Sequence, residues 1–127
     1  MTRWRERRKL AVLGGLLLGL MAGGRALSYE RQSEAAALVA AGRRVYDDRQ
    51  CATCHMIAGQ GNRRFPLDGV ARRLSEADLE RWLTATDEME RALPQQPAIR
   101  MSEWLDDQRA INAKDRAALV AFLATLR

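Results

Sequence analysis

The sequence has very few of the side chains that usually build reactive or metal-binding sites. Its 127 residues include one histidine and two cysteines, so a structural zinc site, which needs four ligands, lacks a second ligand pair. No internal repeat or low-complexity tract is present, and this excludes a repeat architecture. β-Branched residues are also scarce, whereas alanine, leucine and arginine are abundant. This composition favours helices, and we expect an all-α fold.

A hydrophobic run long enough to span a membrane comfortably is missing as well. Residues 2–9 are basic and residues 10–24 are uncharged, but as a helix the latter would span only about 22 Å of a roughly 30 Å hydrocarbon core. Residues 26–28, Ala-Leu-Ser, resemble a signal-peptidase site. We therefore predict an export signal over residues 1–28, cleaved before Tyr29, and a periplasmic location in a bacterial source. The alternative is an uncleaved membrane anchor.

An excess of charge of one sign is absent from the rest of the chain. Residues 1–28 hold six of the 21 basic residues and one of the 16 acidic residues, so residues 29–127 hold 15 of each. The formal net charge of +5 therefore belongs to the predicted export segment. A nearly neutral domain excludes nucleic-acid binding driven by bulk charge. At this domain size, a bound apolar cofactor would help to fill the core.

Periodicity predicts helices on both sides of an irregular central segment. Apolar residues recur at helical spacing over residues 34–47, with Ser33 available as the N-cap. A second helix is predicted to begin at Ser75, in a sequence typical of a capping box, and the last helix begins at Asn112. Over residues 51–74, glycines and a proline interrupt the pattern. We identify four helical segments and no convincing strand.

Both cysteines and the histidine fall within five consecutive residues, Cys51 to His55. A disulfide between Cys51 and Cys54 would close a tiny loop and stabilise little. A thiol redox site would need a strand–helix–strand pattern that the sequence lacks, and zinc would lack further ligands. The spacing is that of the c-type haem attachment signature, C-x-x-C-H, in which two thiols form thioethers and the imidazole binds the iron. We therefore predict one covalently attached haem c.

With this motif placed between helices, residues 40–126 resemble the class I cytochromes c. In that family, a glycine and a following aromatic on the first helix cross an aromatic on the last helix. Gly42, Tyr46 and Phe122 match this pattern. The resemblance implies that residues 29–127 form a small cytochrome c-like helical fold wrapped around one haem.

The same resemblance implies roles for three residues after the attachment motif. Pro66 lies in a segment similar to the family's proline loop, in which the proline carbonyl accepts the Nδ1 proton of the iron-binding histidine. Leu67 follows it directly. Trp82 occupies the place of an aromatic that packs near the haem or bonds to a propionate, with simple core packing as the alternative. We expect all three to contribute to cofactor binding.

The methionines are the candidates for a second axial ligand of the haem iron. Met56 adjoins His55, so it cannot reach the other face of the haem. Met89 falls in phase with the apolar face of the second predicted helix, which favours core packing. Met101 follows a proline-broken segment, where the family's ligand methionine comes from an extended loop. We predict iron ligation by His55 and Met101, with Met89 or no protein ligand as the alternatives.

Histidine and methionine together would leave no open iron position for a substrate. The sequence therefore predicts a single-electron carrier between redox proteins such as a dehydrogenase and an oxidase, and not an enzyme. The alternatives are a sensor or peroxidase-like haem protein with an open distal site, and the small haem subunit of a larger complex. Either a monomer or a subunit is consistent with the sequence. Arg63 and Arg64 could aid partner docking, or form only a solvated basic loop.

Overall fold

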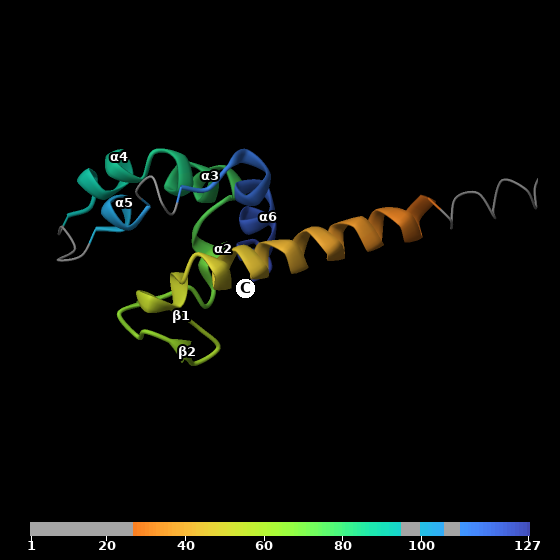
Figure 1. Cartoon of the computed structure of the whole chain (residues 1–127), viewed down its shortest axis with the longest axis horizontal. Helices are drawn as coiled ribbons and strands as arrows, with labels where there is room; N and C mark the ends of the chain where they lie inside the picture. Colours follow the sequence, from red (N-terminus) through yellow and green to blue (C-terminus); the bar gives the residue numbers. More distant parts are fainter. Residues whose placement is uncertain (1–26, 95–99, 106–109) are drawn as a thin grey trace, which may run out of the picture. The chain divides into compact units, whose positions relative to one another are not determined.

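The computed structural model describes residues 27–94, 100–105 and 110–127 (Figure 1). The chain divides into two compact units, residues 1–36 and 37–127. The predicted export segment lies outside the described residues except for its last two, and its cleavage stays a prediction. The elements after residue 50 are η1 (Cys51–Thr53), β1 (His55–Ile57), β2 (Gln60–Gly61), β3 (Phe65–Pro66), α2 (Val70–Arg73), α3 (Glu76–Thr84), α4 (Thr86–Arg91), α5 (Met101–Trp104) and α6 (Ala113–Leu123).

Residues 27–48 are helical, so the helix includes residues before the predicted start at Ser33. Ser33 is not an N-cap, because its hydroxyl lies inside the helix and donates to the Glu30 carbonyl at 2.8 Å. Such a bond satisfies the hydroxyl without ending the helix, and the alanines that follow favour helix. Gln50, with a positive φ of 56°, lies just beyond the helix. Among the described helices, none is both long and apolar enough to cross a membrane.

A small sheet follows, where the sequence analysis expected no strand. β1 pairs antiparallel with β2 and parallel with β3. Ala58 and Gly59, both with positive φ, connect β1 to β2. Gly61 also has a positive φ, and a Cβ there would lie 2.2 Å from the His55 carbonyl oxygen. The all-α prediction is therefore only partly correct: the fold is mostly helical, but it contains strands of two or three residues, too short to produce an alternating sequence pattern.

α3 begins as predicted and ends earlier than expected. Ser75 and Asp78 form a reciprocal capping box, which confirms the predicted start. After Ala85 the chain starts a separate helix, α4, and at this junction the Thr86 hydroxyl donates to the Trp82 carbonyl at 2.6 Å. That hydroxyl takes the acceptor that a continuing helix would bond through its backbone. Met89 therefore belongs to α4, and the prediction that it continues the second helix is wrong.

The crossing of the N-terminal helix with α6 is confirmed. A Cβ at Gly42 would lie 1.9 Å from the Ala118 carbonyl oxygen, so only glycine allows this approach. Tyr46 and Phe122 meet edge to face, with ring centroids 6.1 Å apart. This crossing anchors the buried core, which comprises Val45, Tyr46, Ile57, Val70, Leu79, Leu119, Val120, Phe122 and Leu123.

Candidate functional site: an apolar cavity with two thiols, an imidazole and a methionine

The two cysteines lie on one turn of chain. Gln50 adopts a left-handed backbone and precedes η1, and the Cys54 N–H donates to the Cys51 carbonyl at 3.1 Å. Both cysteines are free and half-buried, and both line one cavity. The turn thus presents two thiols to the same space.

The Cys51 thiol does not have the properties of a redox nucleophile. Burial raises the pKa of Cys51 to about 11, because the thiolate would lose its hydration. The thiol is therefore protonated at neutral pH, whereas reactive redox thiols have lowered pKa values. This shift argues against the thioredoxin-like alternative and leaves both thiols as candidates for a covalent bond to a cofactor.

His55 begins β1 and has a defined partner on β3. Its Nδ1 lies 3.0 Å from the Phe65 carbonyl oxygen, because the parallel register places Phe65 opposite His55. The predicted partner was Pro66, so that assignment is wrong by one residue. Burial lowers the pKa of His55, against the opposing effect of the bond to Phe65. A neutral imidazole that donates from Nδ1 leaves the Nε2 lone pair for a metal.

One mostly apolar cavity brings most of the predicted site residues together. Leu67, Trp82 and Met101 line it, as do both cysteines and His55. Pro66 is not among the lining residues and instead pairs in β3. The remaining lining residues are Tyr46, Gln50, Phe65, Val70, Leu74, Leu79, Leu83, Glu90, Leu93, Trp104, Leu105, Ile111, Leu119 and Leu123. Such mostly apolar walls lower the local dielectric constant, which strengthens the influence of each polar group.

The described methionines differ in their relation to this cavity. Met101 is the first residue of α5 and lines the cavity. Met56 and Met89, in β1 and α4, are not among its lining residues. The cavity thus has a thioether donor that comes from a part of the chain separate from the attachment motif.

Glu90 is an acidic lining residue that the sequence analysis did not identify. Its side chain is 2% exposed, and its carboxylate accepts hydrogen bonds from the segment that contains Met101. No sequence pattern indicates its burial, because an acid on a helix is usually exposed.

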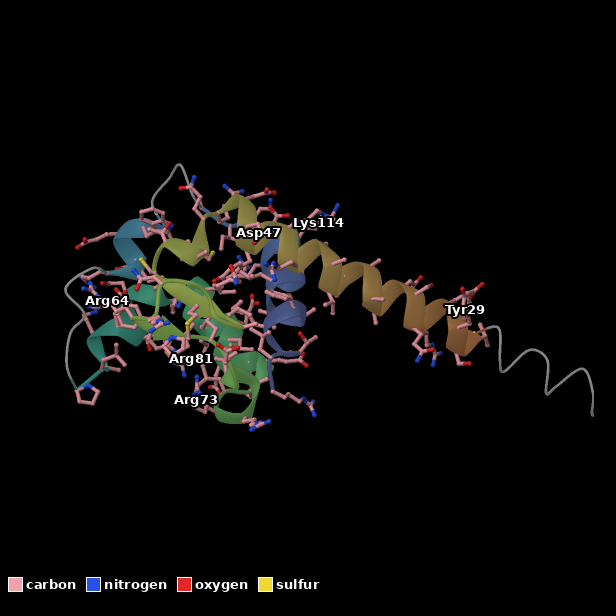
Figure 2. All side chains as sticks on the ribbon, turned by 90° about the horizontal axis from the view of Figure 1, so that it is seen from below. Tyr29, Asp47, Arg64, Arg73, Arg81 and Lys114 are labelled. Atoms are coloured by element: carbon pink, nitrogen blue, oxygen red, sulfur yellow. The ribbon has the colours of Figure 1, made fainter. Side chains whose placement is uncertain are left out.

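Basic side chains occur at two separate places near the attachment motif. Arg63 and Arg64 are exposed and immediately precede Phe65, which lines the cavity and is 37% exposed. Arg73, on α2, lies well apart from Arg64 in Figure 2. Arg64 and Arg73 therefore lie at separate places. Arg63 and Arg64 precede Phe65, which is partly exposed, whereas Arg73 precedes Leu74, a half-buried residue of the same cavity wall.

The fold and the cavity define a small helical domain with the donor set of a covalent haem site. A family model described as cytochrome c matches residues 39–127. This match covers more than half of the chain, which therefore belongs to the cytochrome c family as a class I c-type cytochrome. No curated protein and no solved structure matches the chain. Members of this family bind covalently attached haem c and are generally electron carriers.

The residues around the cavity fit haem c. Cys51 and Cys54 supply two thiols within one turn, and His55 has an oriented imidazole next to them. The apolar walls suit a porphyrin, and Met101 provides a second possible axial donor. The donor set therefore agrees with the family's cofactor, and the chain is a haem-based electron-transfer domain.

Proposed function

We propose that this protein is a mono-haem c-type cytochrome that carries single electrons between redox proteins. In this proposal Cys51 and Cys54 hold the haem through two thioethers, and His55 and Met101 are the axial ligands. The observation that carries the proposal is that one cavity is lined both by the attachment motif and by Met101, which lies on a different helix.

Each ligand residue has a defined task in this proposal. Haem c, when bound, supplies a one-electron couple. The Phe65 carbonyl fixes the orientation of His55 by accepting from Nδ1. The soft thioether of Met101 favours the reduced iron and raises its potential, and the apolar walls act in the same direction by excluding water. If His55 and Met101 both hold the iron, it would have no open position for a substrate, and the protein would serve electron transfer only.

We also propose that the protein is exported to the periplasm and docks redox partners near Phe65. The sequence of residues 1–28 supports export. Phe65 supports the docking site, because it is partly exposed and lines the cavity, so this wall reaches the surface. Arg63 and Arg64 lie next to it and supply positive charge for an acidic partner.

Intact mass and thiol alkylation of the exported protein test the attachment and the processing together. We expect the mass of residues 29–127 plus one haem, with Cys51 and Cys54 blocked to alkylation even after denaturation and reduction. Two freely titratable thiols in the mature protein would contradict the haem attachment. Retention of residues 1–28 in the membrane fraction would contradict only the cleavage, and would indicate an anchored carrier.

A further inference from the structure

Glu90 on α4 is a buried carboxylate in the wall of an otherwise mostly apolar cavity. Its side chain is 2% exposed. Burying a carboxylate costs several kcal/mol unless it is paired and hydrogen-bonded. Its neighbours on the same helix, such as Glu88 with a side chain 66% exposed, are in contact with solvent. The position of Glu90 therefore requires specific partners.

Those partners include three consecutive residues at the start of α5. Oε1 accepts from the backbone N–H of Met101 and from that of Ser102, the latter at 3.3 Å. Oε2 accepts from the Ser102 hydroxyl at 2.5 Å and from Arg100 Nε at 3.2 Å. One side chain thus binds the backbone or side chain of residues 100, 101 and 102. Hydrogen bonds to an ionised acceptor are roughly twice as strong as neutral ones.

α5 depends on this external carboxylate. The helix contains four residues, and its own N-cap residue, Arg100, makes no side-chain capping bond. So short a helix is not stable by itself, because helix nucleation is unfavourable. The first N–H groups of a helix need acceptors, and at Met101 and Ser102 Glu90 supplies one.

Arg100 connects the buried carboxylate to the surface. It also donates to Asp87, one turn before Glu90 on α4, and Asp87 pairs in turn with Arg91 at 2.9 Å. The hydrogen bond to Asp87, followed by the nearby carboxylates, raises the pKa of Arg100, so its charge is permanent. A fixed positive charge at 3.2 Å from Oε2 offsets part of the cost of burying Glu90.

We propose that Glu90 is the positioning residue for the distal ligand: its carboxylate fixes the backbone of Met101, so that the thioether is presented to the cavity. This inference rests on the proposed ligation by Met101. Glu90 acts through the α5 backbone, and it does not itself bind iron. Without the carboxylate, the first turn of α5 loosens and the methionine exchanges on and off the iron.

The test compares Glu90→Ala and Glu90→Gln with a matched control, Glu88→Ala, in the haem-loaded protein. Glu88 is an acid on the same helix, and it makes an exposed pair with Arg81. Three quantities are measured: the sulfur-to-iron charge-transfer band of the oxidised protein, carbon monoxide binding by the reduced protein, and hydrogen exchange at the Met101 and Ser102 amides.

We expect the band to weaken and carbon monoxide binding to increase in Glu90→Ala, with Glu90→Gln intermediate because its amide oxygen still accepts. Exchange at the two amides should become at least about tenfold faster in Glu90→Ala, the effect of losing a hydrogen bond to a charged group. Glu88→Ala should match the wild type in all three measurements. Should Glu90→Ala give no holoprotein, Glu90→Gln decides with the same readouts.

The outcomes separate this inference from the proposed function. A wild type with the band, together with Glu90 variants that match it in band, carbon monoxide binding and exchange, would overturn the positioning role and leave the ligation by Met101 intact. A wild type without the band would overturn the ligation, and the positioning role with it. Equal effects in the Glu88 control would also overturn the inference, because the cause would then be a general loss of α4.

Discussion

The two parts of the cavity wall that supply the proposed axial ligands are built in different ways. The part with His55 comes from one short stretch of chain, where the backbone N–H of Cys54 donates to the Cys51 carbonyl and His55 Nδ1 donates to the Phe65 carbonyl. The part with Met101 comes from two helices, α4 and α5, which a buried carboxylate joins. The first part is specified by a local sequence motif. The second depends on contacts between Glu90 and residues 100–102, which lie outside any such motif.

This difference predicts different kinds of failure. Damage to the attachment turn should remove the cofactor, because covalent linkage and ligation by the histidine depend on the same five residues. Damage to α4 or α5 should leave the haem attached and change only the distal ligation, the potential and the access of small ligands. A change in the helix crossing, which supports the whole domain, should weaken both parts together.

Cys51→Ala or Cys54→Ala should have the largest effect. Each removes one thioether, and a small domain depends on its bound cofactor to complete the core. We expect little stable holoprotein, measured as haem absorbance per mole of purified chain. Normal haem content in both single variants would show that the attachment turn is not essential, and the contrast between the two parts of the wall would disappear.

Gly42→Ala should destabilise the whole domain. The new Cβ would lie 1.9 Å from the Ala118 carbonyl oxygen, so the two helices must move apart. We expect a loss of at least about 3 kcal/mol in the free energy of unfolding, the upper end for overpacking of a core. Denaturant unfolding of the haem-loaded protein measures it. Gly59→Ala serves as a comparison, since nothing lies within 4 Å of a Cβ there, although its positive φ carries a smaller cost.

Met101→Ala should change the coordination of the iron and leave the covalent attachment of the haem intact. We expect the sulfur-to-iron band to vanish and carbon monoxide to bind. The potential should fall by a sizeable part of the roughly 0.8 V over which axial ligands set haem potentials. Met89→Ala is the control, because Met89 is half-buried and does not line the cavity. It should cost at most about 2 kcal/mol of packing. Loss of the band in the Met89 variant instead would reverse the ligand assignment.

Arg63→Glu with Arg64→Glu should have the smallest effect, confined to encounter rates. Oxidation of the reduced protein by anionic ferricyanide should slow by about tenfold at low salt, and raised ionic strength should reduce this difference. The matched control is Arg72→Glu with Arg73→Glu on α2, which does not adjoin the cavity wall at Phe65. If the oxidation rate changes neither with ionic strength nor with the substitution of Arg63 and Arg64, these two residues form only a solvated basic loop and have no role in docking.

The features predictable from the sequence are those that depend on neighbouring residues. The Cys51–His55 motif, the capping box at Ser75 and the glycine crossing at Gly42 each have a local signature, and the structure places them as expected. The sheet was not predictable, because its strands of two or three residues are shorter than the roughly four to eight residues over which an alternating pattern can be recognised. The Phe65 partner of His55 was missed for the same reason, since it follows from the pairing of β1 with β3.

Glu90 shows the other limit of sequence reasoning. The local sequence pattern places Glu90 on a helix, and an acid on a helix is expected to be exposed. Its burial depends on donors from residues 100–102, ten and more positions further on. Such contacts depend on three-dimensional placement, which periodicity does not encode.

The optical spectrum of the oxidised wild type, followed by carbon monoxide titration of its reduced form, tests the central claim most directly. If His55 holds the iron from the attachment turn and Met101 completes its coordination, the oxidised protein is low-spin and shows the weak long-wavelength sulfur-to-iron band, and the reduced protein resists carbon monoxide. A wild type that lacks this band and binds carbon monoxide readily would contradict the account and favour a sensor or peroxidase-like protein with an open distal site.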